Sequence, residues 1–342
     1  MATLDYTRRL QNLQDRRFDR ELNEAYLTKS FSATDIPDNV KYMVESMRPI
    51  DQKYNDRTIT AANRVQKHLE NGFNLHFNRA YKTQGSLMTA TNINVHSDFD
   101  LLTVIDRYHY NDPDVPNEND YTASVPEEDI KELRKQSISI LKGIYDEVDD
   151  TGKKSISIFN KSLNRKVDIV FCFWYHSKKY LETRDEYYKG VYLYKFPNGP
   201  KIRDYPFAHI SQVNTKGDNT HDGSRRGIRL LKTLNADNDN IDLNSFHITT
   251  IVHSIKNDLI YYSSGNELPI AKAMSQEMAH ILNDSSYRTS IKSPNGTENP
   301  LSKSETVSEI EKLKTDLDLL IEDSSKEIVK SLLLEKAIKN YS

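Results

Sequence analysis

The stretch "GSLMTATNINVHSDFDLLTVI", residues 85–105, decides the fold of this chain. A Gly-Ser pair and a polar segment precede a strand pattern in which Asp98 and Asp100 alternate with apolar residues. Because successive side chains of a strand point to opposite faces, both aspartates are expected on one face. Two like charges on one face repel each other unless a cation lies between them. The pattern therefore predicts a divalent metal site at the start of a strand.

A third aspartate follows in a later strand pattern. The stretch "KSISIFNKSLNRKVDIVFCFWY", residues 154–175, predicts two strands joined by a tight polar turn at Ser162–Arg165. Asp168 lies inside the second strand, where an isolated carboxylate is costly unless it is paired or metal-bound. Asp98, Asp100 and Asp168 on two neighbouring strands are a ligand set for two Mg²⁺ or Mn²⁺ ions, the arrangement that drives in-line phosphoryl displacement.

The Gly85-Ser86 pair supplies the second part of the predicted site. A glycine lets the backbone approach a phosphate closely, and exposed N–H groups at the start of a following helix favour anions. The Ser86 hydroxyl can add one hydrogen bond. We therefore expect Gly85 and Ser86 to hold the phosphates of a nucleotide.

The remaining patterns give a coarse fold. Helices are expected in the first 50 residues, over 54–76 and from Glu127 to about Val148, and strands are expected before Gly85, over about 98–105 and in the hairpin. From about residue 206 the patterns are helical, and they end in a long amphipathic C-terminal stretch. The sequence thus predicts an α+β fold, in which residues 1–205 form a core with a small mixed sheet and N-terminal helices, and residues 206–342 form a helical domain.

Composition narrows the class of protein. Of the 342 residues, 37% are hydrophobic and 28% charged, the net charge is −3, and Cys172 is the single cysteine. These values argue against a membrane span, a disulfide, a cysteine-rich zinc site and a protein that coats duplex DNA. The beginning of the chain lacks the apolar stretch of a signal peptide, so cytoplasmic residence is expected.

Taken together, Gly85-Ser86, Asp98-Phe99-Asp100 and Asp168 resemble the catalytic motifs of the polymerase-beta-like nucleotidyltransferase superfamily. More narrowly, the chain resembles the CD-NTases, bacterial relatives of cGAS and oligoadenylate synthetase. The stretch "YPFAHISQVNTKGDNTHDGSRRGIRLLKTLN", residues 205–235, is similar to a family segment with an Asn-x-Lys and a Thr ahead of a helix that ends in a Leu-Lys pair. The matching positions are Asn214, Lys216, Thr220 and Lys232.

This resemblance implies a bilobal enzyme with a central cleft between the core and the helical domain. It implies a nucleotidyltransferase that joins NTPs, purines on family grounds, into a cyclic di- or trinucleotide. Such products serve as second messengers in anti-phage (CBASS) signalling, so a downstream effector would act through the product, with room for a regulatory or activating partner. The resemblance also implies that Asn214, Lys216 and Lys232 bind nucleotide, Asn214 and Lys216 from a loop over Asn214–Thr220. No stable duplex DNA and no membrane is expected as a partner.

Two other classes of function fit parts of the pattern. One is a template-independent transferase that extends RNA or modifies a toxin or an antibiotic, although RNA enzymes of this type carry a large basic acceptor surface. The other is a nucleotide-binding scaffold without catalysis, which would be marked by the loss of a metal aspartate. All three aspartates are present in the sequence.

Overall fold

The computed structural model describes residues 4–19, 36–97, 99–116 and 125–341. The chain divides into two compact units. A sheet unit comprises Asp51–Thr89 and His96–Ser211, and a helical unit comprises Met1–Ile50, Ala90–Val95 and Gln212–Ser342.

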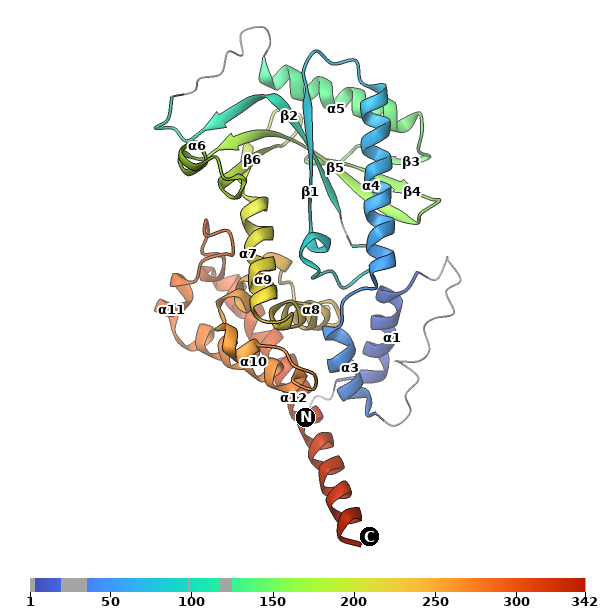
Figure 1. The fold of residues 1–342 in the computed structure, drawn as a ribbon, viewed down its shortest axis with the longest axis vertical. Coiled ribbons are helices and arrows are strands. Elements are labelled where there is room, and N and C mark those ends of the chain that lie inside the picture. The colour runs from blue at the N-terminus through green and yellow to red at the C-terminus, as the bar shows by residue number, and fades with distance from the viewer. Residues whose placement is uncertain (1–3, 20–35, 98, 117–124, 342) are drawn as a thin grey trace. The chain divides into compact units, whose positions relative to one another are not determined.

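A mixed sheet forms the centre of the sheet unit (Figure 1). Its strands in the described part of the chain are β1 (Arg79–Gln84), β2 (Asp100–Asn111), β3 (Glu147–Asp149), β4 (Ser155–Asn160), β5 (Arg165–His176), β6 (Lys189–Tyr194) and β7 (Lys201–Asp204). The strand order is β1-β2-β5-β4-β3, and β6 pairs with both β5 and β7. The long strand β5 is therefore central: it runs parallel to β2 and antiparallel to β4 and β6.

The alternation in β2 and β5 gives the sheet two apolar faces, as predicted. Phe99 and Leu101 lie in one buried cluster together with Ile169 and Phe171. The side chains of the opposite face form a second cluster, whose buried members are Leu102, Val104, Val170, Cys172, Trp174 and Val191. Asp100 lies two positions before Leu102, and Asp168 lies two positions before Val170, so both aspartates belong to that second face.

Helices α4 (Gln52–Gly72) and α5 (Pro126–Lys142) cover the first face (Figure 1). The α4 helix begins at Asp51, whose side chain accepts a hydrogen bond from the Lys53 backbone N–H at 3.0 Å. Its residues at helical spacing, Ala61, Val65 and Leu69, are buried against the sheet. The apolar residues that recur at helical spacing in the sequence therefore form the face of α4 that packs against the core.

The α5 helix ends earlier than the sequence predicted. The prediction ran to Val148, but the helix stops at Lys142, before Gly143. Ile144 is 46% exposed, and Val148 lies in β3, where it pairs with Ile158. Gly143 follows the last helical residue and is a poor helix former, and the segment after it pairs with β4 instead. The strand β2, by contrast, is longer than predicted: it extends past the predicted end at Ile105 to Asn111.

The short helix α6 (Lys178–Thr183) completes the sheet unit, and the helical unit contains most of the remaining helices. Those are α1 (Tyr6–Arg17), α3 (Asp38–Met47), α8 (Gly223–Ala236), α9 (Ser245–Ser254), α10 (Glu267–Asn283), α11 (Ser285–Ser290) and α12 (Ser304–Tyr341). Among the described residues, no helix is both long enough and apolar enough to cross a membrane.

The domain boundary expected at residue 205 lies close to the division between Ser211 and Gln212, but the N-terminal helices group differently. Leu13 and Met43 are buried with Leu231 and Leu317 in one core, so α1 and α3 pack with α8 and α12. The sequence had placed them with the catalytic core. Helical periodicity identifies a face that must be buried, but it does not identify the surface that buries it.

A helix takes the place of the predicted Asn214–Thr220 loop. The α7 helix runs from Pro206 to Asn219, so Asn214 and Lys216 are helical. It starts at a proline, which favours the first position of a helix. A tight turn then leads into α8, with His221 and Asp222 in the left-handed region at φ 51° and 72°.

Candidate functional site

Four polar side chains lie in one row across the sheet. Gln84 of β1 is the direct partner of Asp100 in β2, and Asp100 is the direct partner of Asp168 in β5. Asp168 in turn pairs with Ser157 in β4. Because partners in register project to the same face of a sheet, the two aspartates are neighbours, with a hydrogen-bonding side chain on the outer side of each.

Asp100 is the first residue of β2 and is half-buried. The Gln84 side chain donates a hydrogen bond from Nε2 to Asp100 Oδ2 at 2.8 Å. An amide that donates to a carboxylate restricts its orientation and favours its charged form. Gln84 therefore fixes one oxygen of Asp100.

Asp168 is only 9% exposed. Its backbone N–H donates to Phe99 O at 3.0 Å, which joins the start of β2 to β5. Its carboxylate has two partners: Ser157 Oγ donates to Oδ1, and Lys166 Nζ lies 3.0 Å from Oδ2. The buried charge is thus compensated by one hydroxyl and one cation, as burial requires.

The predicted third ligand, Asp98, lies outside the described residues. In the part of the chain that the structure does describe, no three His, Cys, Asp or Glu side chains form a group that could hold a metal ion. The pair Asp100 and Asp168 nevertheless fits such an ion. Carboxylate oxygens are the ligands that Mg²⁺ and Mn²⁺ prefer, and these two come from adjacent, directly paired positions. Asp98 as the third ligand stays a prediction.

Gly85 and Ser86 follow directly after β1, and therefore directly after the partner of Asp100. Gly85 has φ 115°, a conformation that residues with a side chain rarely adopt, so this turn requires glycine. Ser86 begins a short 3₁₀ helix, Ser86–Thr89, in which the Thr89 hydroxyl donates to Ser86 O at 3.1 Å. The turn places the Gly-Ser pair at the same end of the sheet as the two aspartates. Its contact with phosphate stays a prediction.

Asn214, Lys216 and Lys232 belong to the helical unit, where each has a partner. The Asn214 side chain accepts from Arg225 at 3.2 Å. Lys216 Nζ donates to Ile255 O at 2.6 Å, and burial lowers the pKa of Lys216. These contacts lie within the helical unit, to which the later part of α7 belongs, and the predicted nucleotide contacts of Asn214 and Lys216 remain untested.

Lys232 is the more unusual of the two lysines. It lies on α8 and donates from Nζ to Thr91 O at 3.0 Å. Burial lowers the pKa of Lys232 to about 8, so a buried ammonium is held near its titration point. An anion that approached this ammonium would relieve the cost of burying the charge, which is consistent with the predicted role.

Sequence reasoning missed three side chains of this site: Gln84, Ser157 and Lys166. Two of them carried a local signal. Gln84 immediately precedes Gly85, and Lys166 is two residues before Asp168, so it shares a face with that aspartate. Ser157 carried no local signal, because its place beside Asp168 depends on the register of the β4–β5 hairpin.

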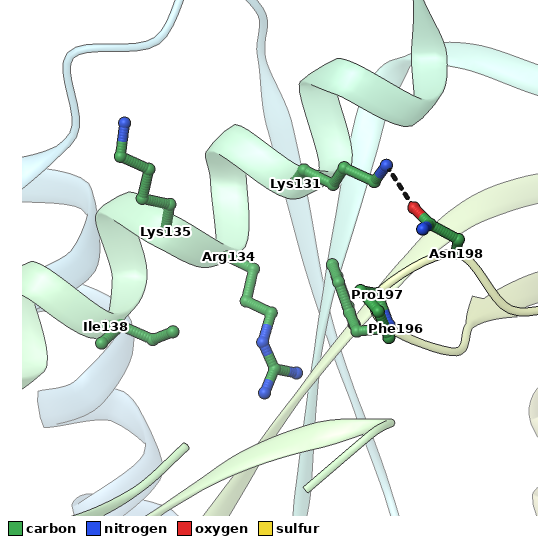
Figure 2. A pocket seen from close by; sticks show the side chains of 7 residues that line it. All are labelled: Lys131, Arg134, Lys135, Ile138, Phe196, Pro197 and Asn198. Atoms are coloured by element: carbon green, nitrogen blue, oxygen red, sulfur yellow. Dashed lines mark hydrogen bonds between the residues drawn. The ribbon is translucent and has the colours of Figure 1, made fainter. Parts of the chain in front are cut away.

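A separate pocket of about 380 Å³ lies away from this row, between α5 and the residues that follow β6 (Figure 2). Phe196 belongs to the cluster on the α5 side of the sheet, the face opposite to Asp100 and Asp168. The pocket contains none of the predicted site residues; its lining is Lys131, Arg134, Lys135, Ile138, Phe196, Pro197 and Asn198.

Comparison with known proteins decides the family. No protein-family model matches the chain. A protein named c-di-GMP synthase from Lachnospiraceae bacterium (strain RUG226) is 33% identical over 288 residues, which cover 75% of this chain and 80% of that protein. The chain belongs to the CD-NTase family. A second relative of this CD-NTase, the cyclic dinucleotide synthase CdnE of Yersinia aleksiciae, is 28% identical over 295 residues, 84% of this chain and 77% of that protein.

Solved structures agree with this assignment. The CD-NTase superimposes on a STING-associated CdnE c-di-GMP synthase from Flavobacteriaceae sp. with a TM-score of 0.82 and 26% identity, covering 95% of this chain and all of that one. A second c-di-GMP synthase structure, from Capnocytophaga granulosa, gives a TM-score of 0.79 at 26% identity. The predicted α+β nucleotidyltransferase fold, the enzyme class and the class of cyclic oligonucleotide synthase are thereby confirmed.

Proposed function

We propose that this CD-NTase makes cyclic di-GMP from two molecules of GTP. Three relatives that match most of the chain bear the name c-di-GMP synthase. Those names support the choice of GTP. The observation that supports nucleotidyl transfer is the row Gln84–Asp100–Asp168–Ser157, in which two carboxylates lie side by side at the end of the sheet from which Gly85-Ser86 emerges.

In this proposal Asp98, Asp100 and Asp168 hold two Mg²⁺ or Mn²⁺ ions. When bound, such ions stabilise charge on a triphosphate and lower the pKa of an attacking hydroxyl. The Ser86 hydroxyl and the Gly85 backbone hold the phosphates of the donor GTP. The carboxylate of Asp168, oriented by Ser157, takes the proton of the acceptor ribose hydroxyl. Gln84 keeps the Asp100 carboxylate turned in one direction.

The ring requires two transfers. In the first, an acceptor hydroxyl attacks the α-phosphorus of the donor, a phosphodiester bond forms and pyrophosphate leaves. The linear intermediate still carries one triphosphate and, on its other nucleotide, a free ribose hydroxyl that can attack it. When it rebinds in the reverse orientation, the same residues join these two ends and release a second pyrophosphate. We propose that Lys232, with Asn214 and Lys216, binds nucleotide in these steps.

The proposal extends to the biological setting. The Flavobacteriaceae structure is described as STING-associated, and we propose that the product of this chain likewise acts on a separate effector protein. Anti-phage signalling, cytoplasmic residence and a regulatory or activating partner belong to the same proposal. They follow from the family resemblance.

The identity of the nucleotides used is tested by supplying them singly and in pairs. The purified enzyme is incubated with Mg²⁺ or Mn²⁺ and with GTP, ATP, CTP or UTP, singly and in all pairs, and the products are identified by mass spectrometry after phosphatase treatment. GTP alone should suffice for a phosphatase-resistant product. A resistant product that forms only with a second nucleotide would contradict the choice of cyclic di-GMP. Elongation of added RNA would support the alternative of an RNA-modifying transferase.

A further inference from the structure

Lys166 and Asp168 form an ion pair inside the predicted metal site. The two residues are separated by one position of β5 and therefore project from the same face. Lys166 Nζ lies 3.0 Å from Asp168 Oδ2, within the contact range of an ammonium and a carboxylate. The Asp168 side chain is 12% exposed, whereas the Lys166 side chain is 43% exposed. A cation thus reaches a buried carboxylate from the solvent side.

The two partners of Asp168 differ in mobility. Ser157 is the direct partner of Asp168 in the β4–β5 ladder, so the backbone fixes its hydroxyl beside Oδ1. Lys166 reaches Oδ2 through a flexible four-carbon stem and is half in solvent. Ser157 can stay in place when a ligand arrives, whereas Lys166 can leave at low cost.

We infer that Lys166 is a placeholder cation, which occupies Asp168 Oδ2 in the metal-free enzyme and is displaced into solvent when a divalent cation binds. This inference rests on the metal site of the proposed function. A buried carboxylate without a counter-charge is destabilising, and Lys166 supplies one charge until the ion supplies two. Lys166 is therefore a positioning residue that competes with the metal.

Competition predicts the direction of a binding change. Replacing Lys166 with glutamine keeps much of the side-chain length and removes the charge. Mn²⁺ binding to the nucleotide-free Lys166→Gln variant, measured by electron paramagnetic resonance, should be about two- to five-fold tighter than in the wild type, because a half-exposed ion pair no longer has to be broken. Lys166→Arg keeps the charge and should bind Mn²⁺ like the wild type.

Lys161 offers a matched control. It belongs to the turn of the same hairpin, is also exposed, and pairs with Asp146 at 3.1 Å, away from the aspartate row. Lys161→Gln makes the same change in net charge and should leave Mn²⁺ affinity unchanged. If Lys161→Gln tightened Mn²⁺ binding as much as Lys166→Gln, the change in net charge would explain both results, and the placeholder role of Lys166 would be contradicted.

Thermal unfolding gives a second readout that a purely structural role would not produce. Lys166→Gln should lower the unfolding midpoint without metal, and saturating Mn²⁺ should restore it to that of the metal-loaded wild type. Weaker or unchanged Mn²⁺ binding in Lys166→Gln, or an equal loss of stability with and without metal, would overturn the inference. So would the absence of Mn²⁺ binding to both proteins. None of these measurements needs turnover, so failure of the proposed function would be seen separately, in the product assay.

Discussion

Asp100 and Asp168 are direct partners across the parallel pair of β2 and β5, and each carboxylate receives a hydrogen bond from the strand on its outer side. The two outer donors, Gln84 and Ser157, lie in the same register. The sheet thus holds two like charges at neighbouring positions and orients both. This arrangement makes each member of the row separately testable.

Gln84→Ala should lower kcat about ten-fold or more and change stability little. The lost bond is a donor to a charged group, worth about 1.5–3 kcal/mol where it acts, and Asp100 would lose its orientation. Steady-state kinetics beside thermal unfolding measure both quantities. Gln52→Ala is the control, because Gln52 donates to the Asp56 carboxylate at the same 2.8 Å, at an exposed position of α4. An unaltered kcat in Gln84→Ala would remove Gln84 from the site.

Asp168→Asn should slow the chemical step more than it weakens donor binding. Asparagine keeps the shape of the side chain but cannot accept the proton of the acceptor hydroxyl, whereas Asp98 and Asp100 can still hold the metal-bound triphosphate. Single-turnover kinetics and equilibrium binding of GTP separate the two effects. Loss of GTP affinity with normal turnover of bound substrate would show that the roles of the aspartates are reversed.

Arg229→Met should destabilise the helical unit by about 3 kcal/mol or more, because three oxygen atoms each lose a hydrogen bond from a charged donor, worth about 1.5–3 kcal/mol. Arg229 is fully buried and donates to Met47 O at 2.7 Å, to Ala90 O at 2.6 Å and to Asp222 Oδ2 at 2.7 Å. Chemical denaturation would measure the loss. Lys272→Met, at an exposed position of α10, should have little effect. Comparable stability of the two variants would contradict a structural role for Arg229.

Stability should fall in acid because of His176. Burial, followed by the charges of His109, Lys189 and Arg184, lowers the pKa of His176 from 6.5 to about 3. Below pH 6.5 the unfolded chain therefore binds a proton that the folded chain excludes, and stability decreases until the pH reaches the folded value. The free energy of unfolding of His176→Phe should fall less steeply between pH 6.5 and 4. A slope in His176→Phe as steep as in the wild type would contradict this assignment.

The sequence predicted the strands β2 and β5 because their signal is local. Alternation in "DFDLLTVI" and "VDIVFCFW" places Asp100 and Asp168 on one face whatever the rest of the chain does. Gly85 was also singled out from a local pattern, the Gly-Ser pair, and its φ of 115° accounts for a glycine at that turn, whereas its contact with phosphate stays a prediction.

The parts that the sequence did not predict depend on contacts between distant segments. The packing of α1 and α3 with α8 and α12 joins residues more than a hundred positions apart, and periodicity alone does not select that partner. Ser157 was missed because its role follows from hairpin register, and the extent of α5 was overestimated because strand pairing of Val148 competes with the helix. Local pattern therefore indicated where Asp100 and Asp168 lie, whereas long-range pairing determined which side chains contact them.

The most direct test of the account uses the wild type and the double variant Asp98→Asn, Asp100→Asn with labelled GTP and Mg²⁺ or Mn²⁺. Removing two like charges should leave the metal-free fold equally or more stable, as seen by thermal unfolding. The wild type should give a short product that resists phosphatase and has the mass of a cyclic dinucleotide, and the double variant should give none. A double variant that retains more than a few per cent of the activity would contradict the account, as would wild-type label found on RNA or protein.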